Sequence, residues 1–175
     1  MKEVFEQIAL EENAQLQIAS DKHMAPSLHS GVGGTIFTTV YTLDVEYKGY
    51  LIKVVNELGG QDVASVVCEL PEQPNHNELE IMTKGGLFQI FSPKHLLCFS
   101  VKSRNQNLKA SIESSNVLFR LGDLVKSTRF DPITIGKNRD GLYKLSMHYH
   151  LLFKERENVV RPIIDFYKQL INYLG

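Results

Sequence analysis

The sequence predicts an α+β fold: a bent antiparallel β-sheet of meanders and hairpins with an N-terminal helix, one short internal helix and a C-terminal amphipathic helix packed on the sheet. Three observations support this prediction. Several runs of β-branched and aromatic residues alternate with a period of two. Most connections between them are too short for the helix that a parallel arrangement requires. The last residues of the chain carry apolar side chains at helical spacing.

The chain has 175 residues, a length typical of one domain, and a formal net charge of −1. We expect a single domain over 1–175, in which 1–34 form a helix and a flexible connector and 35–175 form the sheet-and-helix core. A charge this close to zero provides no long-range attraction to nucleic acids or anionic membranes. Neither is therefore an expected partner.

The chain contains two cysteines, Cys68 and Cys98, and both lie in apolar runs typical of strands. Two cysteines are too few for a disulfide scaffold, and a free cysteine often behaves as a small core residue. No run approaches the roughly 20 apolar residues that span a bilayer, and the first residues are too polar for an export signal. We therefore expect two buried, reduced thiols in a soluble cytoplasmic protein.

Residues 2–19 are rich in Glu, Ala, Gln and Leu, which favour a helix. The apolar face of this helix is formed by Val4, Phe5, Ile8 and Ala9. The helical pattern disappears over 21–34, where Pro26 and a glycine-rich run predict a flexible connection. We expect the helix either to pack on the same domain or to contact a partner, which includes a second copy of the chain.

Alternating residues predict three consecutive strands over 36–47, 50–58 and 63–70. Lys48-Gly49 predicts a tight hairpin turn between the first two strands, and Gly59–Asp62 predicts the next turn. A further hairpin is expected from 79–83 and 87–91, followed by strands over 96–102 and 108–113. The expected sheet therefore has about six to eight strands, a usual size.

The period changes to that of a helix at Val117, where Ser115 or Asn116 can cap the first turn and Asp131-Pro132 should end the helix. A hairpin is expected from 133–136 and 142–153. The C-terminal helix is expected to begin near Asn158 as its cap, with Pro162 in the first turn. The residues that predict its apolar face are Ile163, Phe166, Tyr167, Leu170, Ile171 and Leu174.

The pattern that most suggests a functional site is His148-Tyr149-His150, because residues two apart on a strand point to the same face. Two imidazoles could bind a divalent metal if a third ligand came from elsewhere. The alternative is that both histidines lie on the solvated side of the strand, and Lys144 on that face favours it because its charge opposes a metal. His148 and His150 are the only candidate metal ligands.

No segment carries a motif for catalysis or for cofactor binding, so we expect neither catalytic residues nor a cofactor. Gly136-Lys137 lacks the upstream glycine of a phosphate-binding loop. His95 and Cys98 are three apart, which puts them on opposite faces of a strand. Asp44 and Glu46 share a strand face, where paired carboxylates serve acid–base chemistry or only solubilise the strand.

Basic residues also come close together between Lys94 and Lys109, and we interpret them as part of a solvated loop. The absence of a catalytic pattern, together with strand edges available for β-augmentation, favours a non-enzymatic intracellular binding or scaffolding module. Its partner would be another protein or a second copy. One alternative is a carrier with a cavity for a small apolar ligand between the sheet and the last helix. The other is an enzyme whose site is assembled from dispersed residues, His148 and His150 among them.

Overall fold

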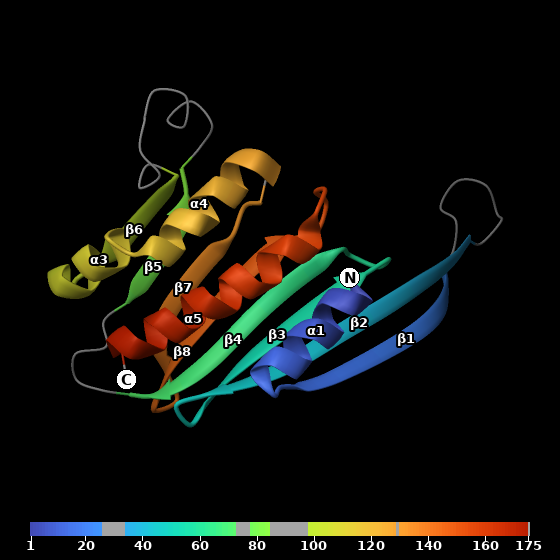
Figure 1. Cartoon of the computed structure of the whole chain (residues 1–175), viewed down its shortest axis with the longest axis horizontal. Coiled ribbons are helices and arrows are strands. Elements are labelled where there is room, and N and C mark those ends of the chain that lie inside the picture. The colour runs from blue at the N-terminus through green and yellow to red at the C-terminus, as the bar shows by residue number, and fades with distance from the viewer. Residues whose placement is uncertain (26–33, 73–77, 85–97, 129, 175) are drawn as a thin grey trace.

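The computed structural model describes residues 1–25, 34–72, 78–84, 98–128 and 130–174. Its centre is one open antiparallel sheet of eight strands in the order β1-β2-β3-β4-β8-β7-β5-β6. The α-helices α1, α3, α4 and α5 lie on the same side of this sheet (Figure 1). The α+β class with helices near both ends and inside the chain is therefore confirmed.

The strands are β1 (Gln15–Ala25), β2 (Gly34–Tyr47), β3 (Tyr50–Leu58), β4 (Val63–Pro71), β5 (Leu79–Thr83), β6 (Phe99–Ser103), β7 (Ile133–Arg139) and β8 (Leu142–His150). The helices are α1 (Lys2–Glu12), α3 (Gln106–Glu113), α4 (Asn116–Thr128), the 3₁₀ helix η2 (Arg156–Val159) and α5 (Val160–Leu174).

The N-terminal helix is shorter than the sequence predicts. It ends at Glu12, because Asn13 adopts a left-handed conformation with φ 50° and its N–H bonds back to the last turn. Gln15–Ala25 then forms strand β1, so the prediction of helix up to residue 19 and of a flexible connector from residue 21 is wrong for this part. The rest of the predicted connector, 26–33, lies outside the described residues. The helix packs on the sheet through Phe5 and Ile8, which are buried.

The predicted meander is confirmed by the pairing of β2 with β3 and of β3 with β4. Tyr47 pairs with Tyr50 across the turn at Lys48-Gly49, as predicted. Both turn residues have positive φ, 52° and 80°, which is the geometry of a type I′ turn. The same arrangement joins β7 to β8 through Asp140 and Gly141, so the hairpin predicted from 133–136 and 142–153 is confirmed, although its second strand ends at His150.

The segment after β5 differs from the prediction. Strand β5 pairs with β6 and β7, and the predicted partner strand over 87–91 lies outside the described residues. The expected strand over 108–113 is wrong, because these residues belong to helix α3. The side chain of Asn105 caps α3 by accepting a hydrogen bond from the N–H of Leu108 at 3.1 Å. Leu108 and Ile112, one helical turn apart, provide its buried side.

Helices α4 and α5 follow the sequence pattern closely. The hydroxyl of Ser115 accepts hydrogen bonds from the N–H groups of Val117 and Leu118, which confirms the predicted cap of α4. The expected cap of the last helix is wrong: Asn158 lies inside η2, and its amide donates to the carboxylate of Glu155. The predicted apolar face of α5 is buried, and the Tyr167 hydroxyl donates to the Val66 carbonyl of β4 at 2.9 Å.

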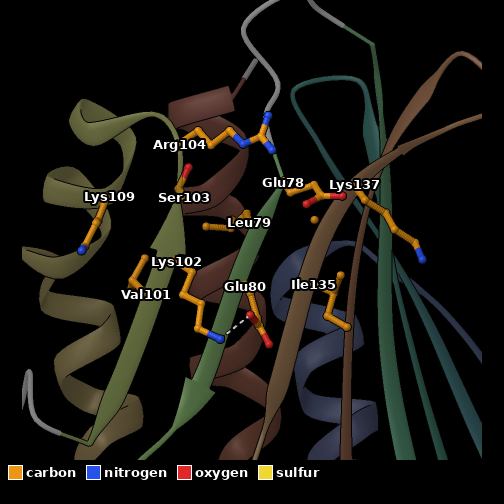
Figure 2. A pocket seen from close by; sticks show the side chains of 11 residues that line it. Glu78, Leu79, Glu80, Val101, Lys102, Ser103, Arg104, Lys109, Ile135 and Lys137 are labelled. Atoms are coloured by element: carbon orange, nitrogen blue, oxygen red, sulfur yellow. Dashed lines mark hydrogen bonds and ion pairs between the residues drawn. The ribbon is translucent and has the colours of Figure 1, made fainter.

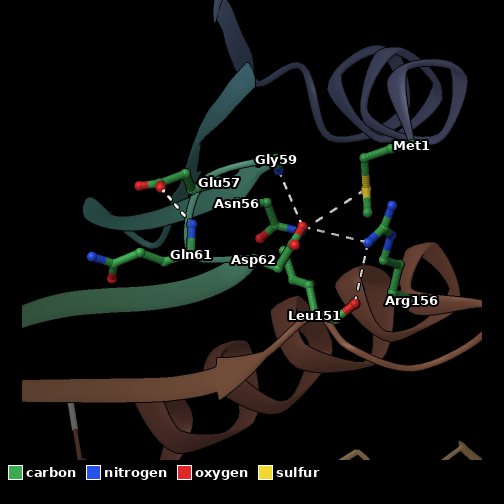
Figure 3. Close-up of polar contacts among 8 residues, drawn as sticks. All are labelled: Met1, Asn56, Glu57, Gly59, Gln61, Asp62, Leu151 and Arg156. Carbon is green, nitrogen blue, oxygen red and sulfur yellow. Dashed lines mark hydrogen bonds and ion pairs between the residues drawn. The ribbon is translucent and has the colours of Figure 1, made fainter. Parts of the chain in front are cut away.

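A polar network ties the β3–β4 turn to the segment after β8 (Figure 3). The carboxylate of Asp62 accepts from the N–H of Gly59 at 3.2 Å and lies 3.7 Å from the guanidinium of Arg156. Arg156 also donates to the Leu151 carbonyl at 3.2 Å. Beside this network, the fully buried Asn56 directs its amide toward the sulfur of Met1 at 3.9 Å. These contacts fix the end of the sheet beneath the start of α1.

Candidate functional site

Two regions of the sheet are left uncovered by the described helices. The first is the whole side away from the helices, which we term the open face. Each strand contributes alternate side chains to it, for example Lys53 on β3, Val67 on β4, His148 on β8 and Ile135 on β7. The second is the outer edge of β1, which is the last strand on its side of the sheet. These regions are the candidate functional surfaces.

His148 and His150 lie on the open face and are exposed. His148 is paired with Ser65 on β4 and with Ile133 on β7, and these two residues share its face. The histidines line a depression of about 570 Å³ that also contacts Glu57 and Asp131. Within the described ranges, no three His, Cys, Asp or Glu side chains come close enough to hold a metal ion. The structure therefore places the two imidazoles together without bringing a third ligand to them.

Further depressions lie along the same open face. One of about 760 Å³ extends over β1, β2 and β3, where Val40 and Thr38 line it. Another of about 380 Å³ lies between Lys53, Glu69 and Lys144. None of these depressions lies between α5 and the sheet, where the alternative of an apolar-ligand carrier requires a cavity. In that layer the side chains of α5 are buried against the strands instead.

Basic residues gather around a depression of about 550 Å³ at one end of β5, β6 and β7 (Figure 2). The cations are Lys102, Arg104, Lys109 and Lys137. Lys102 lies on a strand and Lys109 on a helix, so their interpretation as a loop is wrong; Lys94 lies outside the described residues. Glu78 and Glu80 also line the depression, and Glu80 pairs with Lys102 at 2.8 Å. The two carboxylates offset half of the four positive charges. The depression therefore suits a surface of mixed charge better than a phosphate.

The remaining candidates from the sequence form no catalytic group among the described residues. Asp44 and Glu46 share the open face, as their spacing predicts, and lie opposite Lys53 and Leu51 of β3. The Oδ1 atom of Asp44 is buried and has no hydrogen-bond partner among the described residues. Cys68 and Cys98 are both free and buried, as expected. His95 lies outside the described residues, so the His95–Cys98 pair has no described geometry.

The outer edge of β1 is long and regular. All eleven residues of β1 pair one-to-one with β2, from Gln15 opposite Asp44 to Ala25 opposite Gly34, so the strand contains no bulge. Among the described strands β2 is its only neighbour. Gln17, Ile18, Ala19 and Ser20 are exposed. Outward-pointing backbone N–H and C=O groups along such an edge are a template for another strand.

The opposite edge of the sheet is protected in the ways that edge strands usually are. Strand β6 has only five residues and carries Lys102, and helix α3 follows it directly and contacts it. Strand β1 is likewise preceded by a helix that contacts it, α1, but it is more than twice as long, has no proline and is uncharged from Gln15 to Ser20. The two edges of one sheet therefore differ sharply in their readiness to accept a partner strand.

Sequence reasoning missed this edge, because β1 falls in the part of the chain that was assigned to helix and connector. One local signal was present. Gln15-Leu16-Gln17-Ile18 alternates polar and apolar residues, which is the pattern of a strand with one buried face. Leu16 and Ile18 do lie on the helix side, opposite Leu43 and Tyr41.

Comparisons of the chain with models of protein families, with curated proteins and with solved structures found no match. No helix in the described part of the chain is both long and apolar enough to cross a membrane.

Proposed function

We propose that this chain is a non-enzymatic binding module that recognises an extended segment of a partner protein by β-augmentation at the outer edge of β1. The observation that carries the proposal is the eleven-residue edge strand, which lacks the proline or bulge that protects such edges. An added strand would satisfy the outward backbone groups. Side chains of β1 on both faces would then give specificity.

Other features support a reducing compartment and a protein partner. Both cysteines are buried and unpaired, which suits a reducing compartment such as the cytoplasm. The net charge of −1 suits a protein partner better than a nucleic acid. The residues of β1 nearest to α1, from Gln15 to Ser20, carry no charge that would repel an incoming strand.

The test uses short random peptides displayed on phage, selected on the whole purified chain. Binding of a selected peptide is measured by fluorescence polarisation, and the bound site is mapped by hydrogen exchange of backbone amides. The expected result is slower exchange along β1. Slower exchange confined to other strands, or no selectable peptide, would contradict the proposal.

Two adjacent variants, Ala19→Pro and Ser20→Pro, provide an internal control. Neighbouring residues of an edge strand direct their N–H groups to opposite sides, so one proline removes an outward donor and the other removes a donor to β2. We expect one variant to keep its stability and to weaken peptide binding at least about tenfold, or about 1.4 kcal/mol. The other should lower the free energy of unfolding by more than about 1 kcal/mol. Equal peptide affinity in the stable variant would show that β1 is not the site.

A further inference from the structure

The strand register aligns open-face side chains in rows that cross the sheet. One such row runs from β2 to β6 through Asp44, Lys53, Val67, Ser146, Ile135, Glu80 and Lys102. Ser146, on β8, is the middle of this row. Three residues follow it on the β4 side and three on the β7 side.

The two halves of this row are complementary when they are read outward from β8. The first position on each side is apolar, Val67 on β4 and Ile135 on β7. The second position has Lys53 on β3 and Glu80 on β5. The third position is occupied by Asp44 of β2 on one side and Lys102 of β6 on the other. Each charge therefore has its opposite at the same distance from β8.

The neighbouring rows repeat the pattern on the strands that flank β8. Lys144 of β8 lies on the centre line, where it would face its own copy, and it pairs with Glu69 of its own chain at 3.3 Å. Glu69 on β4 and Lys137 on β7 flank it and carry opposite charges. On the other side of the first row, Val55 of β3 and Met82 of β5 are both apolar and occupy matching positions two strands from β8. Ile133 and Ile135 are 43% and 39% exposed, which leaves apolar surface in the middle of this charged pattern.

We propose that two copies of this chain pack face to face through their open faces, about a twofold axis that runs along β8. This rotation places β4 of one copy over β7 of the other, β3 over β5 and β2 over β6. Lys53 then faces Glu80 of the second copy, Asp44 faces Lys102, and Glu69 faces Lys137. Val67 faces Ile135, and Val55 faces Met82.

The geometry of such a dimer is an ordinary one. Two sheets pack face to face at about 10 Å with their strands within about 30° of each other. Seven strands about 4.8 Å apart and three rows about 7 Å apart offer about 700 Å² per copy, close to the area that each partner of a stable complex buries. Helices would cover both outer sides. Interactions made by one copy with the other are then repeated by symmetry.

The dimer leaves the β1 edges free. Four strands lie on the β4 side of β8 and three on the β7 side, so β1 has no counterpart in the second copy. A dimer would thus present two β1 edges, although peptide binding at β1 does not depend on it. Failure of dimerisation and failure of peptide binding are therefore separate results.

The decisive variant is Lys137→Glu, examined by sedimentation velocity over a concentration series. Within its own chain, the new carboxylate is attracted by Lys144 and repelled by Glu78, so the two effects on the stability of the single chain oppose each other. In the dimer, the new carboxylate of each copy faces Glu69 of the other copy, so the repulsion occurs at two symmetric places. We expect the unmodified chain to sediment as a dimer and Lys137→Glu to dissociate at least about tenfold more readily.

The double variant Glu69→Lys with Lys137→Glu exchanges the charges and should restore the dimer. Lys126→Glu makes the same change of charge on α4, an exposed position on the helix side, and should leave the dimer intact. Circular dichroism verifies that each variant is folded. A monomeric unmodified chain, a dimer that tolerates Lys137→Glu, or a double variant that stays monomeric would each overturn the proposal.

Discussion

At the scale of single residues, Gly49 and Gly59 share a backbone conformation and differ in their surroundings. Their φ angles are +80° and +85°, a region that other residues rarely adopt. A Cβ on Gly49 would meet nothing within 4 Å, whereas a Cβ on Gly59 would lie 2.0 Å from the Phe37 carbonyl oxygen. Only Gly59 therefore has both a conformational and a steric requirement.

We expect Gly49→Ala to lower the free energy of unfolding by about 1 kcal/mol, the cost of the left-handed conformation alone. Gly59→Ala should cost at least about 2 kcal/mol more, because β2 and the β3–β4 turn must move apart. Urea unfolding of both variants gives the comparison. Similar costs for the two substitutions would mean that the turn relaxes without moving β2.

The thiol of Cys68 links stability to pH. Burial, and to a smaller extent the negative charge of Glu69, raises its pKa from 9.0 to about 12. The folded chain therefore keeps this proton between pH 9 and 12 while the unfolded chain releases it, so stability falls as pH rises through this window. The loss for this one group amounts to about 1.4 kcal/mol per pH unit.

Cys68→Val removes this titration while preserving an apolar side chain that suits a strand. We expect the decrease in unfolding free energy between pH 9 and 10, measured in urea, to be smaller in the variant than in the unmodified chain. Burial also raises the pKa of Cys98, so a residual slope should remain. Identical slopes would show that Cys68 is not protected from ionisation in the folded chain.

At the scale of elements, local patterns predicted those segments whose stability is decided locally. The β2–β3–β4 meander has alternating side chains and a two-residue turn at Lys48-Gly49, and both signals lie within the segment itself. Helix α5 has a full apolar stripe, and α4 has a cap at Ser115. The positions of His148 and His150 on a polar strand face followed from the same period of two.

Where prediction failed, a distant contact or a cap decided the structure. Gln15–Ala25 has side chains that favour a helix, but eleven pairings with β2 place it in the sheet. The pattern from Leu108 to Glu113 fits a strand or a helix, and the Asn105 cap selects the helix. The complementary rows of the open face depend on the order of strands in the sheet. That order is not encoded in any one segment.

At the scale of the whole molecule, one hydrophobic core joins both ends of the sheet. The buried cluster includes Phe5 of α1, Leu43 of β2, Leu121 of α4 and Ile163 of α5. Helix α5 is central to it, since it contacts α4 and α3 and reaches β4. A continuous core of this kind favours unfolding as one cooperative unit, which is what a single domain requires.

Tyr167→Phe tests this cooperativity, because it removes the hydrogen bond of 2.9 Å between α5 and the Val66 carbonyl of β4 in the middle of the core. We expect a loss of about 1 kcal/mol. Hydrogen exchange in low urea would measure this loss separately in β2 and in α4, which lie on opposite sides of the contact between α5 and β4. In one cooperative unit, the slowest amides of both elements lose the same protection, because they exchange only when the whole chain unfolds. Two domains would respond differently: only one of the two elements would lose protection, and unfolding in urea would separate into two transitions.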